Sequence, residues 1–224
     1  PDMRGIDVAF IYKKDIFKPS NISKHFLKIA DASGKPRYTR DQLLVSGEME
    51  GETIHFIVNH WPSRSGGEAA SRPFREAAAA LNKKIIDSLT KIDPMAKVIS
   101  MGDFNDDPTN SSFKKVLKTK AHKEDVKQGE LYDPMENMYK KGVGSLAYRD
   151  SWSLFDQFVI TYGYLKPNND GYSYWKAGIF NSPELASPSG KYAGYPFRSY
   201  SNGSYTGGYS DHFPAYLYLI KEKK

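Results

Sequence analysis

The sequence predicts an α/β fold built on a mixed β-sheet. Apolar runs of strand length recur along the chain, two of them are joined by a tight turn, and one Ala-rich segment has helical spacing. Strands that alternate with few helices, some of them in hairpins, indicate a mixed sheet rather than a doubly wound parallel one. The 224 residues contain no linker, repeat or low-complexity tract, so we expect a single domain over residues 1–224.

The first half of the chain supplies the clearest elements. Two apolar runs flank Met49-Glu50-Gly51-Glu52, where Gly allows the turn of a β-hairpin. The segment 68–91 has Leu and Ile at helical spacing among alanines, and Pro73 is tolerable in such a helix only near its first turn. Residues 16–40 are mixed and polar, so an irregular or short-strand crossing is expected. The expected strands are residues 7–12, 42–48, 53–60, 96–101, 154–161 and 213–220, and a short helix is expected at 112–117.

Composition limits the classes of function. The formal charge of +6 and the pI of about 9.2 suggest an anionic partner, although a mildly basic surface without a partner explains them equally well. No cysteine is present, which excludes disulfides and thiolate chemistry. No apolar stretch reaches the length of a membrane span, and the mean hydropathy is −0.61. We expect a monomer; the compartment stays open, with an extracytoplasmic location favoured.

Four polar clusters lie at the ends of apolar runs, which solvated loops do not readily explain. The most informative is Ser210-Asp211-His212 just before the last strand, because a carboxylate beside an imidazole suits a metal ligand next to a group that contacts phosphate. The other three clusters are Asn59-His60-Trp61-Pro62-Ser63-Arg64, Gly102-Asp103-Phe104-Asn105 and Leu154-Phe155-Asp156-Gln157.

Asp103 and Asn105 follow a buried strand and are two residues apart. Both side chains can therefore project from the same edge of the sheet. The carboxylate can bind a hard metal ion and orient a water, and the amide can contact a phosphoryl oxygen without adding negative charge. An Asx-rich turn, which Asp106-Asp107-Pro108 also favours, explains the motif about as well.

His60 and Arg64 flank a rigid Trp-Pro turn. The imidazole could donate a proton to a leaving oxygen while Arg64 neutralises phosphate. Taken alone, a capped strand end with a buried Trp61 explains this cluster better. His25, His55 and His122 have no comparable context and are expected to be structural or exposed.

Asp156 is a charge within an apolar run, so it needs a partner if it is buried. We expect that partner to be His212, because an Asp–His hydrogen bond fixes the imidazole tautomer and raises its basicity. A structural ion pair of Asp156 with Arg149 or Arg198 is the alternative. The Tyr-rich segment 172–209 could stack bases or sugars, but packing of an extended surface loop is preferred.

Taken together, these motifs resemble the later part of the endonuclease/exonuclease/phosphatase superfamily. The resemblance starts at Arg4-Gly5-Ile6-Asp7-Val8-Ala9 and continues in family order through His60, the Asp103 and Asp156 motifs, and Ser210-Asp211-His212. It implies a four-layer α/β sandwich, in which two sheets of mixed, largely antiparallel strands are flanked by helices. The first strands of that fold are expected to be absent here. The metal-binding Glu and the Asn of the family's first half have no counterpart in this sequence.

The same resemblance implies hydrolysis of phosphate esters with Mg²⁺ or Mn²⁺. By position, Asp103 would orient or activate water, Asn105 would hold the phosphoryl group, and Asp211 would join Asp103 as a metal ligand. His212, oriented by Asp156, and His60 would serve the transition state and the leaving group. The substrate would be a phosphate ester, nucleic acid included. The alternatives are a phosphatase of small phosphoesters and a degenerate, non-catalytic anion-binding module.

Overall fold

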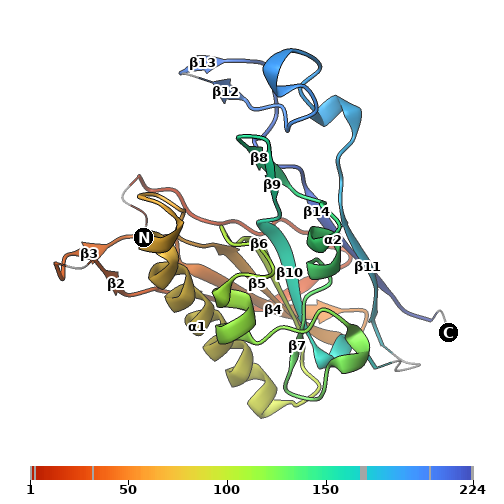
Figure 1. Cartoon of the computed structure of the whole chain (residues 1–224). Coiled ribbons are helices and arrows are strands. Elements are labelled where there is room, and N and C mark those ends of the chain that lie inside the picture. Colours follow the sequence, from red (N-terminus) through yellow and green to blue (C-terminus); the bar gives the residue numbers. More distant parts are fainter. Residues whose placement is uncertain (1, 3, 32, 167–170, 202, 223–224) are drawn as a thin grey trace.

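A six-stranded mixed sheet organises the fold (Figure 1). The computed structural model describes residues 2, 4–31, 33–166, 171–201 and 203–222. The strand order in the sheet is β1-β4-β5-β6-β10-β7; β5 and β6 are parallel and the other neighbours antiparallel. Its strands are β1 (Lys18–His25), β4 (Gln42–Met49), β5 (Glu52–His60), β6 (Lys97–Asp103), β7 (Leu131–Tyr132) and β10 (Asp156–Thr161).

A second, two-stranded sheet completes the predicted two-sheet α/β architecture. It pairs β11 (Ser173–Ile179) with β14 (Ala215–Ile220) in antiparallel fashion. Apolar side chains from both sheets, among them Phe158, Ile99 and Leu217, form one core cluster. A second cluster buries the apolar face of α1 (Glu68–Ile92) against the other side of the large sheet. The layers are therefore helix α1, the six-stranded sheet and the β11–β14 sheet.

Shorter elements connect these layers. They are the strands β2 (Ile29–Ala30), β3 (Pro36–Arg37), β8 (Leu146–Tyr148), β9 (Ser151–Ser153), β12 (Tyr200–Ser201) and β13 (Ser204–Tyr205), the helix α2 (Glu136–Lys140), a π-helix at Ser112–Leu117, and 3₁₀ turns at Lys123–Asp125, Tyr162–Tyr164, Pro183–Leu185 and Gly190–Tyr192.

The hairpin and the long helix form where the sequence predicts them. β4 and β5 are joined at Glu50 and Gly51, whose φ angles of 48° and 82° fit the left-handed turn of a tight hairpin. Helix α1 is amphipathic and buries Ala78, Ile85 and Ile86. Pro73 lies inside this helix, beyond the first turn. The long buried face stabilises α1 despite the hydrogen bond that proline cannot donate.

Several expected elements differ from the structure. Residues 7–12 form no strand, because no described strand pairs with them; Phe10 instead packs on Phe17 and Phe56. The expected irregular crossing contains the eight-residue edge strand β1. The expected surface loop at 172–209 begins with β11, which pairs with β14. The last strand is half-exposed rather than buried, since it belongs to a small outer sheet.

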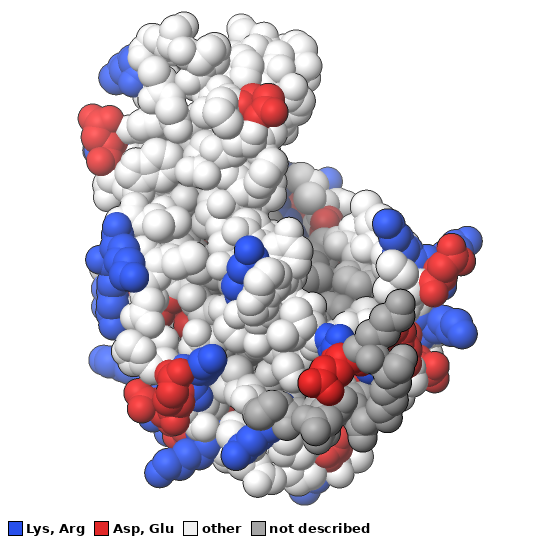
Figure 2. All heavy atoms as spheres, turned by 90° about the vertical axis from the view of Figure 1, so that its right-hand side faces the viewer, with Lys and Arg blue, Asp and Glu red and all other residues white. Residues whose placement is uncertain are grey.

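A projection formed by β8, β9, β12 and β13 and the 3₁₀ turns between β11 and β12 extends from one end of the sheets (Figure 1). Figure 2 shows few charged side chains on its visible face, whereas Lys, Arg, Asp and Glu gather over the body below. Tyr195 packs against Trp152 and Tyr192 within the projection, while Tyr200, Tyr205 and Tyr209 are exposed. Over the described part of the chain, no helix is long and apolar enough to cross a membrane.

Candidate active site

Strand register brings three polar residues together at one edge of the large sheet. The parallel β5–β6 pairing sets His60 beside Asp103, and the antiparallel β10–β6 pairing sets Asp156 on the other side of Asp103. Side chains of residues paired across strands lie on the same face of a sheet. Asp156 opens β10 instead of lying inside a core strand, and 21% of its side chain is exposed. The desolvation of its charge therefore costs less free energy than the sequence suggested.

His60 contacts Asp103 and is neutral. Its Nε2 atom lies 3.4 Å from Oδ2 of Asp103. Burial lowers the pKa of His60 to about 4, and the positive charges of Arg40 and His212 act in the same direction. The contact is therefore not an ion pair at neutral pH. A neutral imidazole at this position can accept or donate a hydrogen bond without changing the charge of the site.

Asp103 and Asn105 are held by a strained loop. Asn105 adopts φ of 52°, a left-handed conformation that Asn tolerates better than most residues. Its backbone N–H donates to Oδ1 of Asp103 at 2.8 Å, and its side-chain Nδ2 donates to the Trp61 carbonyl at 3.0 Å. Burial raises the pKa of Asp103 to about 6, and the charge of Asp156 adds to this effect. Asn105 thus lies beside Asp103, with its amide nitrogen engaged by the protein.

The predicted Asp156–His212 pair is present. Nδ1 of His212 lies 2.7 Å from Oδ2 of Asp156. Burial by itself would lower the pKa of His212, but the hydrogen bond and charge of Asp156 outweigh it and raise the pKa to about 9. His212 is therefore an imidazolium at neutral pH. Neither Arg149 nor Arg198 forms an ion pair with Asp156 among the described residues.

Ser145 fixes the relative position of the two partners, a role that sequence reasoning missed. Its carbonyl accepts the N–H of Phe213, the residue after His212, at 2.7 Å. Its hydroxyl oxygen accepts the N–H groups of Phe155 and Asp156 at 3.2 and 3.3 Å. Ser145 is completely buried. Since a lone Ser between loops carries no pattern of its own, only the fold reveals this role.

Asp211 lies on the exposed side of the site. Its side chain is 57% exposed, and its ion-pair partner is Arg198 at 3.9 Å. Asp103 and Asp211 offer the carboxylate oxygens that Mg²⁺ and Mn²⁺ prefer. The described residues contain no group of three or more His, Asp or Glu side chains placed to enclose a cation. An ion of the Mg²⁺ type needs only one or two protein carboxylates, because water and substrate oxygens complete its shell.

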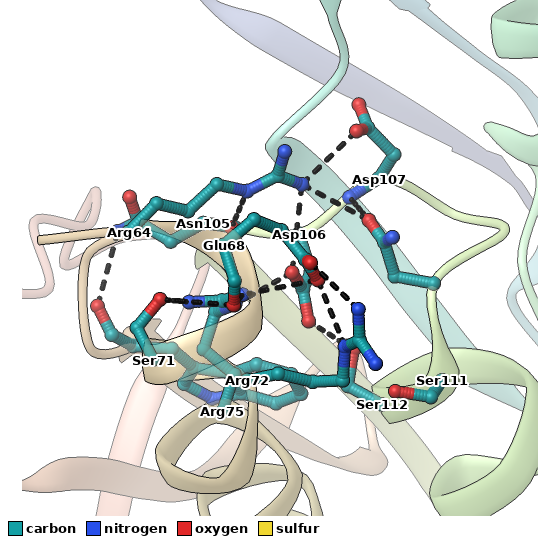
Figure 3. A network of polar contacts seen from close by, with 12 residues as sticks. Arg64, Glu68, Ser71, Arg72, Arg75, Asn105, Asp106, Asp107, Ser111 and Ser112 are labelled. Carbon is teal, nitrogen blue, oxygen red and sulfur yellow. Dashed lines mark hydrogen bonds and ion pairs between the residues drawn. The ribbon is translucent and has the colours of Figure 1, made fainter. Parts of the chain in front are cut away.

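Arg64 differs from its expected role as a phosphate ligand (Figure 3). Its Nε donates to the carbonyl of Asn105 at 3.0 Å, and its Nη2 donates to Asp107 and Asn110, both at 3.0 Å. Its guanidinium also stacks on Phe155 at 4.4 Å. These partners follow Asp103 in the chain. Arg64 is therefore committed to holding the loop that carries Asp103 and Asn105.

A buried ion pair supports the same loop from helix α1 (Figure 3). Arg75 donates to Oδ1 of Asp106 at 2.5 Å, and Ser112 donates to Oδ2 at 2.7 Å. Gln157 donates to the Asp106 carbonyl at 2.6 Å. The side chains of Arg75 and Asp106 are both completely buried. The Asx-turn interpretation of Asp106 is thus incomplete, because this carboxylate links the loop to α1.

Two pockets lie beside this group of residues. A pocket of about 200 Å³ is lined by Asp156, His212 and the adjoining residues Ser210 and Phe213. A larger pocket of about 280 Å³ lies on the His60 side and contains three arginines, Arg4, Arg37 and Arg40. Arg37 and Arg40 did not stand out in the sequence, because they come from a polar segment without a recognisable motif.

The fold and the site define an α/β sandwich with carboxylates and imidazoles at the ends of its central strands. The sequence model of the Endonuclease/Exonuclease/phosphatase family matches residues 1–221, and the chain belongs to this family. Members of the superfamily are phosphoesterases, phosphatases and nucleases among them, and generally use divalent metals. No curated protein sequence matches the chain.

Solved structures share the fold at low sequence identity. A mannosyl-6-phosphatase from Bacteroides thetaiotaomicron has a TM-score of 0.54 and 17% identity, covering 93% of this chain and 69% of its own. TDP2 from D. rerio, complexed with single-strand DNA product, has a TM-score of 0.54 and 14% identity, covering 93% of this chain and 70% of its own. A protein of unknown function from Enterococcus faecalis has a TM-score of 0.54 and 14% identity, with coverages of 94% and 69%. At these identities the likeness concerns the fold.

Proposed function

We propose that this chain carries the active site of a metal-dependent hydrolase that cleaves phosphate esters by in-line attack of water, with phosphodiesters, nucleic acid included, as its substrates. The observation that carries the proposal is the Asp156–His212 hydrogen bond of 2.7 Å beside Asp103. One edge of the sheet thus carries the positively charged imidazole of His212 and the carboxylate of Asp103, which can receive a proton. In-line displacement at phosphorus requires both a positioned nucleophile and positive charge at the developing oxyanion.

Each residue has a role that follows from its environment. Asp103, with its pKa raised to about 6, orients the attacking water and accepts its proton. His212 uses Nδ1 to bind Asp156, so its Nε2 atom is the one that serves the phosphoryl oxygens or the leaving group. His60 contacts Asp103 and stays neutral, which suits a hydrogen bond to phosphate or leaving group.

The remaining roles concern the metal ion and the loop. Asn105 holds Asp103 through its backbone N–H and would contact the phosphoryl group beside it. Asp103 and Asp211 would hold Mg²⁺ or Mn²⁺ together with water and substrate oxygens, and the ion would supply charge that neutralises the phosphate. Arg64 supports this loop rather than the substrate.

Hydrolysis of bis(p-nitrophenyl) phosphate tests the proposal. The protein should release nitrophenolate with Mg²⁺ or Mn²⁺, and EDTA should abolish the release. Asp103→Ala and His212→Ala should each lower turnover by roughly 10²-fold or more, because each removes a group that moves a proton or stabilises charge. His122→Ala is the matched control, since His122 is exposed and lies outside the site. Activity that survives either site variant contradicts the assignment.

The alternatives give different results in related assays. A phosphatase of small phosphoesters would hydrolyse p-nitrophenyl phosphate in preference to the diester, and its affinity for substrate would change little with salt. A nuclease would lose affinity steeply as salt rises, because phosphate contacts release counterions. A non-catalytic module would bind anions equally well with and without Mg²⁺ and would show no turnover with any of these compounds.

A further inference from the structure

The arginine-containing pocket beside His60 has the features of a built anion site. Its volume is about 280 Å³, near the lower end of the range for small-molecule sites. Arg37, the last residue of β3, and Arg40, in the segment before β4, contribute guanidinium groups, and His60 and Trp61 form another wall. Arginine presents a planar fork of donors that matches phosphate oxygens.

The charge of the pocket is positive. Its described lining contains three arginines and one carboxylate, Asp2, which gives a net charge of +2 with neutral His60. Asp2 is ion-paired with Arg4 at 3.0 Å, so these two largely compensate each other. Arg37 and Arg40 supply the remaining charge. Arg40 is close enough to His60 for its charge to lower the pKa of that imidazole.

Contacts with the core hold this wall of the pocket in place. Gln42, two residues after Arg40, is buried, and its side-chain Nε2 donates to the Ala78 carbonyl of α1 at 2.7 Å. The guanidinium of Arg37 lies 4.7 Å from the centre of the Phe74 ring, also on α1. Thr39 between the two arginines is buried. The arginines therefore extend from an anchored segment, which lowers the entropic cost of binding an anion.

We propose that Arg37 and Arg40 bind a second, non-scissile phosphate of the substrate. His60 is shared by the pocket and the site, since it lines the pocket and contacts Asp103. A substrate with its scissile phosphate at Asp103 can therefore extend past His60 into the pocket. This inference rests on the proposed function and narrows the substrate class to compounds with at least two phosphates.

Calorimetry in EDTA tests the pocket without turnover. The ligands form two pairs: a dithymidine dinucleotide with and without a 5′-phosphate, and a hexose bisphosphate against the monophosphate. In at least one pair, the additional phosphate should raise the affinity about tenfold. Charge-assisted hydrogen bonds to the arginines contribute about this much binding free energy. Arg40→Gln should remove this gain and Arg40→Lys should keep part of it. Lys91→Gln, a charge-matched control at the far end of α1, should leave it unchanged.

The outcomes separate the two proposals. The pair that shows the gain tells whether the second phosphate belongs to a nucleotide chain or a small molecule. No gain in either pair, or a gain that persists in Arg40→Gln with an unchanged melting temperature, overturns the inference. Failure of the proposed function shows independently, as absence of hydrolysis by the wild-type protein with Mg²⁺ or Mn²⁺.

Discussion

Nδ1 of His212 donates to Oδ2 of Asp156 at 2.7 Å, although 56 residues separate the two in the sequence. The carboxylate lies at the start of a strand of the large sheet and the imidazole in the loop before the small one. This hydrogen bond fixes the imidazole tautomer and keeps the ring charged near neutral pH. The pair therefore joins the two sheets of the sandwich at the candidate site.

Asp156→Asn should lower the pKa of His212 from about 9 toward its ordinary value near 6.5, because the amide accepts a hydrogen bond but supplies no charge. The fold should persist and phosphodiester turnover should fall by roughly 10²-fold. NMR titration of the His212 ring protons in EDTA measures the pKa directly. Asp125→Asn, at an exposed turn, is the control. An unchanged His212 pKa would show that Asp156 does not govern the imidazole.

The sequence allowed this dyad to be predicted because a carboxylate in an apolar run must find a partner, and few residues can provide one. The hairpin of β4 and β5, helix α1 and strand β6 were predictable for a similar reason, since their apolar patterns are local. The role of Arg64 was not predictable. Its partners Asp107 and Asn110 lie more than 40 residues away, and a free arginine and a committed one look the same in sequence.

Strand pairing shows the same limit of local patterns. Residues 7–12 are apolar enough for a strand but pair with no other strand in the described structure. β1 and β11 are polar or aromatic segments that become strands because β4 and β14 lie alongside them. A strand depends on its partner as much as on its own residues, and the partner is fixed by the whole fold.

Gly102→Ala should lower the free energy of unfolding by a few kcal/mol, as expected for a substitution that causes a severe steric clash. A Cβ atom at this position would lie 2.0 Å from the carbonyl oxygen of Asn59, and the φ angle is 132°. Relief of this clash would push β6 from β5 and move Asp103 away from His60. Thermal unfolding measures the loss. Gly129→Ala is the matched control, because Gly129 also has positive φ but opens into free space. Equal losses in the two variants would exclude the steric explanation.

Arg75→Leu should cost about 3–5 kcal/mol of unfolding free energy, because it removes the buried, nearer ionic partner of the Asp106 carboxylate and leaves only Arg64, at 3.5 Å. Arg72→Leu, three residues earlier on the same helix, should cost about 1 kcal/mol or less. Arg72 is 47% exposed and pairs with Glu68 at the surface. Urea unfolding of both variants makes the comparison. A similar, small effect of both substitutions would mean that the loop holds without the ion pair.

Asp133 should make the fold less stable as the pH rises from about 4 to 7. It is completely buried, its Oδ1 accepts the N–H of Met135 at 2.8 Å, and its Oδ2 has no hydrogen-bond partner among the described residues. Burial raises the pKa of Asp133 to about 7. The folded state therefore keeps a proton that the unfolded chain releases near pH 4, so stability is lost across this interval and changes no further above it.

Asp133→Asn should remove most of this dependence, because the amide is neutral at every pH and retains the acceptor for Met135. The free energy of unfolding in urea, measured at pH 5 and pH 8, should fall less in the variant than in the wild type, by an amount on the order of a few kcal/mol. Asp125→Asn, at an exposed position, should keep the wild-type dependence. If Asp133→Asn and the wild type lose the same stability between these pH values, Asp133 is ionised in the folded protein and a cation or water must satisfy it.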